Sequence, residues 1–142
     1  MSGAGPAGRT LRAFRHPVLW VAGWVMLFAL VAVGSLWSAD DLPSPSISGF
    51  DKLQHFVGYA VLSAWAVMLF ARIRVQALAA LLVIAFGIAI EVAQGLMTVD
   101  RSAESADAVA NALGALAGLL LSPTPLAGAL QRLDARLGRT RG

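Results

Sequence analysis

The sequence predicts an all-α membrane protein, built as a four-transmembrane-helix bundle with both termini in the cytoplasm. Three observations predict this class. Hydrophobic residues make up 58% of the 142-residue chain and charged residues 13%, against roughly 45–50% and 25% in soluble domains. Four apolar stretches have lengths that suit helices crossing a bilayer. The basic residues fall in the segments on one side of these stretches, as the positive-inside rule requires.

The first predicted span covers residues 17–37. It follows a basic arm, residues 1–16, that contains three arginines and is expected to lack fixed structure. The span is apolar for about 20 residues, enough to cross a bilayer, and Trp20, Trp24 and Trp37 lie toward its ends, where interfacial aromatic residues belong. A cleavable signal peptide is the alternative, but its apolar core would exceed the usual length of about 7–15 residues. We therefore expect a retained helix.

Three further spans complete the predicted domain, which covers residues 17–121. A loop rich in Asp, Pro and Ser precedes the second span, a tight basic turn (Arg72-Ile73-Arg74) precedes the third, and a second polar loop precedes the fourth. A Ser-Pro-Thr-Pro sequence then stops the last helix. The remaining residues, 122–142, form a basic tail with leucines at helical spacing, so we expect an amphipathic helix along the membrane surface. The three spans are residues 51–71, 75–97 and 105–121.

The basic residues set the predicted orientation. The arm, the basic turn and the tail together contain nine of the 11 Lys and Arg residues; Lys52 and Arg101 are the other two. Because cytoplasmic segments are enriched in Lys and Arg, both termini should be cytoplasmic. This rule also explains the net charge of +3 without a nucleic-acid partner, and membrane lipids are the expected partners. The absence of cysteine excludes disulfides, thiolate nucleophiles and Cys-ligated metal centres.

Polar residues gather at the outer ends of the second, third and fourth spans. At about 100° per residue, those of each span share one face of its helix. Because such groups would be bare if they faced lipid, we expect the three faces to meet in a pocket inside the bundle. The residues are Asp51, Lys52, His55 and Tyr59 on the second span, Glu91 and Gln94 on the third, Arg101 in the loop that follows, and Asp107 and Asn111 on the fourth.

Glu91 is the centre of this set. It lies in an otherwise apolar run, where an ionisable group costs up to roughly 3 kcal/mol on insertion scales and usually serves a function. Structural alternatives exist for the others: Asp51 and Asp107 suit a first helical turn, Lys52 can reach headgroups, and amides can join helices. Gly114 and Gly118, with Ala110, form a seam of small residues typical of close helix packing.

The pattern of these residues resembles the VanZ-like family of small bacterial membrane proteins, one member of which is associated with teicoplanin resistance. The resemblance covers residues 50–121 and rests on Asp-Lys-x-x-His-Phe-x-x-Tyr from Asp51, Glu-x-x-Gln from Glu91, and Arg101 followed by Asp107, Asn111 and Gly114. It implies a multi-pass protein of the bacterial inner membrane that acts on, or protects, a cell-envelope precursor or lipid. It implies no settled catalytic mechanism.

Four hypotheses of different classes follow. In the first, an outward-facing pocket binds or modifies an amphiphilic envelope molecule. Lys52, Arg101 and His55 then hold an anionic headgroup while Glu91 or His55 acts as general acid or base. Asp107 joins these two as a candidate catalytic residue, and no cofactor is required. The remaining candidate ligand-binding residues are Asp51, Tyr59, Gln94 and Asn111.

The other hypotheses compete with this pocket. His55, Glu91 and Asp107 suit zinc or manganese, but no HExxH-like motif is present and Lys52 and Arg101 would repel a cation. A small transporter subunit lacks inverted-repeat or broken-helix signals, unless the protein forms a homo-oligomer. A non-catalytic scaffold, whose polar residues lock helix packing, is the main alternative. Whether the protein is an enzyme stays open at this point.

Overall fold

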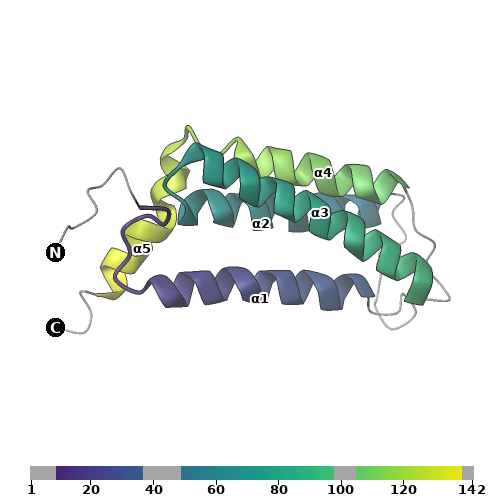
Figure 1. Ribbon diagram of the computed structural model, residues 1–142, viewed down its shortest axis with the longest axis horizontal. Coiled ribbons are helices and arrows are strands. Elements are labelled where there is room, and N and C mark those ends of the chain that lie inside the picture. The colour runs from purple at the N-terminus through teal and green to yellow at the C-terminus, as the bar shows by residue number, and fades with distance from the viewer. Residues whose placement is uncertain (1–8, 37–48, 98–104, 139–142) are drawn as a thin grey trace.

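The computed structural model describes residues 9–36, 49–97 and 105–138. Within these ranges the protein is all-helical, as predicted, and the helices match the four predicted spans to within two residues. Helices α2, α3 and α4 pack together, α1 runs along one side of them, and α5 lies across one end (Figure 1). The elements are α1 (Pro17–Leu36), α2 (Phe50–Leu69), α3 (Ile73–Met97), α4 (Ser105–Leu119), the 3₁₀ helix η3 (Pro125–Gly128) and α5 (Ala129–Leu137).

Helices α2 and α4 are in the closest contact because glycines on α4 let the two backbones approach. A Cβ atom added at Gly114 would clash with the carbonyl oxygen of Phe56, and one added at Gly118 with that of Ala60. The predicted seam of small residues is therefore confirmed at both glycines. This close approach fixes the register of the two helices and sets the spacing of every side chain that projects between them.

Aromatic residues hold α1 against the other helices. The Trp24 indole donates a hydrogen bond to the carbonyl oxygen of Leu62, 2.9 Å away. The ring of Phe28 packs edge-on against both Trp24 and Phe86. We predicted that Trp20 and Trp24 mark the membrane interface. Trp20 is 7% exposed, because α1 uses this ring as a contact surface within the protein. Trp37, the third tryptophan of that prediction, lies outside the described residues.

At the end opposite the predicted pocket, the helices are joined by hydrogen bonds that were not predicted from the sequence. Gln76, at the start of α3, donates to the carbonyl oxygen of Phe70 (2.8 Å) and accepts from the Ser122 hydroxyl (2.6 Å). These bonds join the end of α2 to the start of α3 and to the chain beyond α4. The basic turn is shorter than predicted, since α3 begins at Ile73.

Asp134 of α5 joins the last helix to the start of the first. Its carboxylate accepts hydrogen bonds from the backbone amides of Arg15 and His16, from the His16 ring at 3.1 Å, and from the Trp20 indole at 2.9 Å. Burial alone would raise the pKa of this carboxyl, but these hydrogen bonds outweigh burial and lower its pKa to about 2. Asp134 thus binds the two residues that precede α1 and the Trp20 side chain of its first turn, from a distant part of the chain.

Two predictions about the ends of the chain need correction. Residues 9–16 of the basic arm have a fixed path: the amide of Arg12 donates to the carbonyl oxygen of Leu69 and that of Ala71 to Thr10, at 2.8 and 2.9 Å. The amphipathic tail helix exists as α5, but one of its faces is buried in the protein through Leu130 and Asp134. Both differences arise because residues 9–16 form hydrogen bonds with α5 and with the end of α2.

Among the described residues, two helices are long and apolar enough to cross a membrane: α1, and α3 over Ile73–Leu96. Helix α2 begins with polar residues, and α4 has 15 residues, a length of roughly 22 Å against a hydrocarbon core of roughly 30 Å. An all-helical fold with two candidate membrane-spanning helices is therefore what the structure establishes.

The close packing of α2 against α4 predicts that a single added methyl group at Gly114 destabilises the fold. Gly114→Ala should lower the free energy of unfolding by about 1–3 kcal/mol, the usual cost of overpacking, because the new atom meets backbone rather than a movable side chain. Thermal unfolding in detergent, followed by tryptophan fluorescence, measures the change.

Gly58→Ala is the matched control for the seam. A Cβ atom there meets only Val31 Cγ2, at 3.8 Å, so the better helix propensity of Ala should leave stability unchanged or raise it by up to about 1 kcal/mol. Equal losses in the two variants would contradict the role given to the seam.

Asp134→Asn should loosen α5 from the start of α1. An amide cannot provide the negative charge that Arg15, His16 and Trp20 now share, so trypsin should cut faster at Arg132 and Arg136. Asp51→Asn, which removes an exposed carboxylate at the other end of the protein, should leave the cleavage rate unchanged.

The wild-type protein supplies the pH control for Asp134. Because its pKa in the folded protein lies below the unfolded value of about 3.9, its stabilising effect is present above that value and is lost only as pH falls toward 2. Cleavage at α5, corrected for trypsin activity, should be equal at pH 6 and pH 8. A marked difference would show that another group controls the docking.

Candidate functional site

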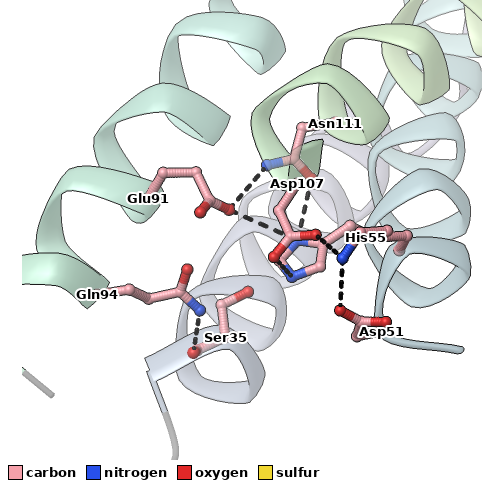
Figure 2. Close-up of polar contacts among 8 residues, drawn as sticks. Ser35, Asp51, His55, Glu91, Gln94, Asp107 and Asn111 are labelled. Carbon is pink, nitrogen blue, oxygen red and sulfur yellow. Dashed lines mark hydrogen bonds and ion pairs between the residues drawn. The ribbon is translucent and has the colours of Figure 1, made fainter. Parts of the chain in front are cut away.

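The candidate site lies where α2 and α4 begin and α3 approaches its end. Three helices place their polar side chains there, and Figure 2 shows Glu91, His55, Asp107 and Asn111 pointing toward one another. His55, Glu91 and Asp107 each offer one nitrogen or oxygen atom, and these atoms lie within 4.8 Å of one another. The seam at Gly114 explains the meeting of α2 with α4, since it holds their backbones close one to two turns away from the site.

Glu91, Asn111 and His55 form a continuous polar chain across the three helices. The Asn111 amide nitrogen donates to Glu91 Oε1 at 3.4 Å, and the Asn111 oxygen lies 3.1 Å from His55 Nδ1. A carboxylate only accepts hydrogen bonds, so Glu91 fixes which way the Asn111 amide points. The amide oxygen then requires a proton on His55 Nδ1, which assigns the tautomer of the neutral ring.

The other side of the His55 ring faces Asp107. His55 Nε2 lies 3.9 Å from Asp107 Oδ2, while the second carboxylate oxygen, Oδ1, is 3.3 Å from the Lys52 ammonium group. Lys52 also contacts Asp51 at 3.0 Å. The charged groups thus run from the interior outward, from the buried Asp107 to Asp51, whose side chain is 55% exposed.

The polar side chains of this site are buried, unlike polar residues on a protein surface. Glu91 is 5% exposed, Asp107 9% and Asn111 1%. Buried ionisable groups are held only where partners compensate the loss of water, and they cluster at functional sites. A histidine between two buried carboxylates, with its own side chain 10% exposed, can accept, donate and pass on a proton, which suits acid–base chemistry.

Tyr59 contributes to the wall of the site. It is 1% exposed and packs with Leu62, Val83 and Ala115. Its hydroxyl makes no hydrogen bond to any other part of the described chain. The ring passes close to Gly87 and Asn111: a Cβ atom at Gly87 would lie 2.8 Å from Tyr59 Cε1 and 3.0 Å from Asn111 Cβ. Glycine at this position, one turn before Glu91, is what lets the tyrosine ring fit.

Gln94 takes a different partner from the rest of the predicted set. Its amide nitrogen donates to the carbonyl oxygen of Ser35 at 2.7 Å and so joins α3 to the end of α1 (Figure 2). Arg101, the last predicted ligand-binding residue, lies outside the described residues. The structure therefore brings together Asp51, Lys52, His55, Glu91, Asp107 and Asn111, with Tyr59 beside them.

Sequence reasoning missed some polar residues, for reasons that differ. Ser35 takes part through a backbone oxygen, which no side-chain pattern reveals. Gln76 was hidden within an apolar span, although a lone amide there is itself a signal. Asp134 lies between Arg132 and Arg136 in the basic tail, far from any other carboxylate in the sequence, and this isolation was the available signal.

Comparisons with known protein families, with curated proteins and with solved structures find no match to this chain. The likeness to the VanZ-like family therefore rests on the sequence pattern alone, and the function has to be argued from the site.

Proposed function

We propose that this protein is a diverged VanZ-like protein of the bacterial inner membrane, whose outward-facing polar pocket binds or modifies an amphiphilic cell-envelope precursor or lipid. The observation that carries the proposal is the meeting of His55, Glu91 and Asp107 from three helices within 4.8 Å. Packing alone does not require two buried carboxylates beside a histidine, since neutral amides join helices at lower cost.

Exposed apolar surface supports a membrane setting. Only 6% of the residues of α1 are buried, and Val25, Met26 and Leu30 are each 60% exposed. Such a continuous apolar surface is characteristic of contact with lipid. In the proposed arrangement α2 and α4 also cross the membrane, and the short α4 does so with the help of the turn residues that follow it.

An amphiphile suits the surroundings of the site. Beside Glu91, the α3 residues Ile88, Val92 and Leu96 are 53%, 54% and 82% exposed, and they recur every four residues along one side of the helix. A polar headgroup in the pocket would place its acyl chain along this stripe. The ligand thus combines a headgroup that forms hydrogen bonds or carries charge with a hydrocarbon tail.

Within this proposal, His55 is the general acid or base. Asn111 holds its Nδ1 proton, so Nε2 is the nitrogen that exchanges a proton with the ligand. Asp107 stabilises the charged form of the ring. Lys52 lies on the outer side of Asp107 and binds an anionic part of the headgroup, although Asp51 and Asp107 offset part of its charge. Arg101, outside the described residues, is the second basic residue proposed for this role.

A non-catalytic scaffold is the second candidate, and the bond from Gln94 to Ser35 favours it. That bond joins α3 to α1, so the Gln94 amide nitrogen has a structural role in helix packing. The two candidates differ in what removal of the Glu91 charge should do.

The proposed topology is tested by reporter fusions. A reporter that is active only outside the cytoplasm should work after Ser46 and Ser102 and should fail after Arg74 and Arg139, because four spans place both termini inside. Activity at Arg139 with none at Ser102 would reverse the orientation, and activity at Arg74 would remove one span from the proposal.

The variant Glu91→Gln distinguishes a role of the carboxylate in ligand binding from a role in folding. The amide keeps the size of the side chain and can still accept from Asn111, so folded yield should stay normal. Lipids that remain bound through purification in mild detergent, identified by mass spectrometry, should include one class enriched over the bulk membrane. Loss of a charge-assisted contact should reduce that class about tenfold in the variant.

Asp134→Asn is the control for this comparison, because it removes a buried carboxylate far from the pocket. It should retain the bound lipid in proportion to folded protein. If Glu91→Gln retains the lipid equally well, the carboxylate is structural and the scaffold is the better account.

A further inference from the structure

We propose that the site binds one divalent metal ion, Mn²⁺ or Zn²⁺, through His55, Glu91 and Asp107. The inference goes beyond the proposed function, whose headgroup binding needs no metal; while an ion is bound, His55 Nε2 acts as its ligand and does not exchange protons. It stands on the geometry of the described residues. In the sequence analysis, Lys52 and Arg101 argued against a metal because both would repel a cation. The structure weakens this objection for Lys52, whose ammonium group lies beside the Asp107 oxygen that faces away from His55.

The three donors lie close to the spacing that one ion requires. Their candidate ligand atoms are within 4.8 Å of one another. Bonds of about 2.1 Å around a tetrahedral ion place donor atoms about 3–3.5 Å apart. Side-chain rotations that shorten these separations, by up to roughly 1.3–1.8 Å for the longest, would complete the set.

The tautomer of His55 points to a cation between the ring and Asp107. Since Nδ1 carries its proton toward Asn111, the Nε2 lone pair of the neutral ring faces Asp107 Oδ2 across 3.9 Å. Two acceptors that face each other repel unless a proton or another positive species lies between them, and a divalent ion is the species proposed here. Asn111 thus plays the part of the outer partner that orients a metal-binding histidine.

Lys52 leaves the inner face of the carboxylate accessible. Its ammonium group contacts Asp107 through Oδ1 and contacts Asp51 beyond it, whereas Oδ2 is the oxygen that faces His55. Across the described part of the site, three carboxylates accompany one lysine and one histidine. The carboxylates of Glu91 and Asp107 are the negative groups that a divalent ion bound to His55 would balance.

Tyr59 provides an independent indication of a ligand. Its hydroxyl is buried, has no hydrogen-bond partner among the described residues, and is close enough to interact electrostatically with Glu91. Nearly all buried hydroxyls have a partner. A water molecule bound to a metal at Glu91 is a suitable one, since it can both donate and accept.

The donor types select the ion. One imidazole with two carboxylates suits Mn²⁺ or Zn²⁺, whereas Cu⁺ prefers sulfur ligands, and Ca²⁺ prefers six to eight oxygen ligands. A bound ion would also give an anionic headgroup a positive partner deeper than Lys52. Lipid binding that persists without metal would leave the proposed function standing while the metal proposal fails.

Manganese binding to the purified full-length protein tests the proposal. After treatment with EDTA, the protein in detergent is titrated with Mn²⁺, and the free ion is followed by electron paramagnetic resonance. We expect one ion per chain, displaced by Zn²⁺, with a pulsed-resonance signal from one imidazole nitrogen. Asp107→Asn and His55→Gln should each weaken binding at least about tenfold, a loss of about 1.4 kcal/mol or more.

Two control variants distinguish this site from general attraction to acidic groups. Asp134→Asn removes a buried carboxylate at the opposite end of the protein, and His16→Gln removes the histidine beside it; both variants should bind the ion within about twofold of wild type. The proposal is overturned if the wild-type protein binds neither ion at one per chain, if the nitrogen signal is missing, or if the controls lose as much affinity as the ligand variants. The wild-type result decides the question even if a ligand variant does not fold.

Discussion

The contact of the α2 and α4 backbones at Gly114 and Gly118 is the constraint on which the rest of the structure depends. A side chain at either position would push the helices apart, and His55 would then lose its reach to Asp107 and Asn111. The cost of burying these polar groups is met only while all of them stay within contact distance. Close packing and the polar site are therefore one feature: the glycines have no chemistry of their own, yet they set the distances at which the chemistry works.

Much of this arrangement is predictable from the sequence because it is periodic. Apolar runs of sufficient length predict the helices, and the spacing of Asp51 and His55, or of Asp107 and Asn111, places each pair on one helical face. A face with polar groups has to turn inward within an apolar bundle. That reasoning brings together six of the nine predicted residues, and Tyr59 borders them. Gln94 departs from the group because a backbone oxygen of α1 lies nearer, and helical periodicity says nothing about backbone partners in another element.

The opposite end was not predictable in the same way. Asp134 meets its partners across 114 to 119 residues of sequence, and no local pattern specifies such a pair. Trp20 fits the description of an interfacial residue as well as that of a buried donor, since both need an apolar ring with one polar atom. Composition also favours a lipid-facing tail, while the structure buries one of its faces. Which alternative holds depends on tertiary contacts alone.

The bond between Asp134 and the start of α1 has a consequence for biosynthesis. Residue 134 leaves the ribosome 114 residues after Trp20, a delay of roughly 6 to 23 s at ordinary rates of translation. Throughout that interval the amides of Arg15 and His16 and the Trp20 indole lack their carboxylate partner and must rely on water or headgroups. Helix α1 thus acquires these contacts only after α2, α3 and α4 have been made, so its docking at this end follows the synthesis of the other three helices.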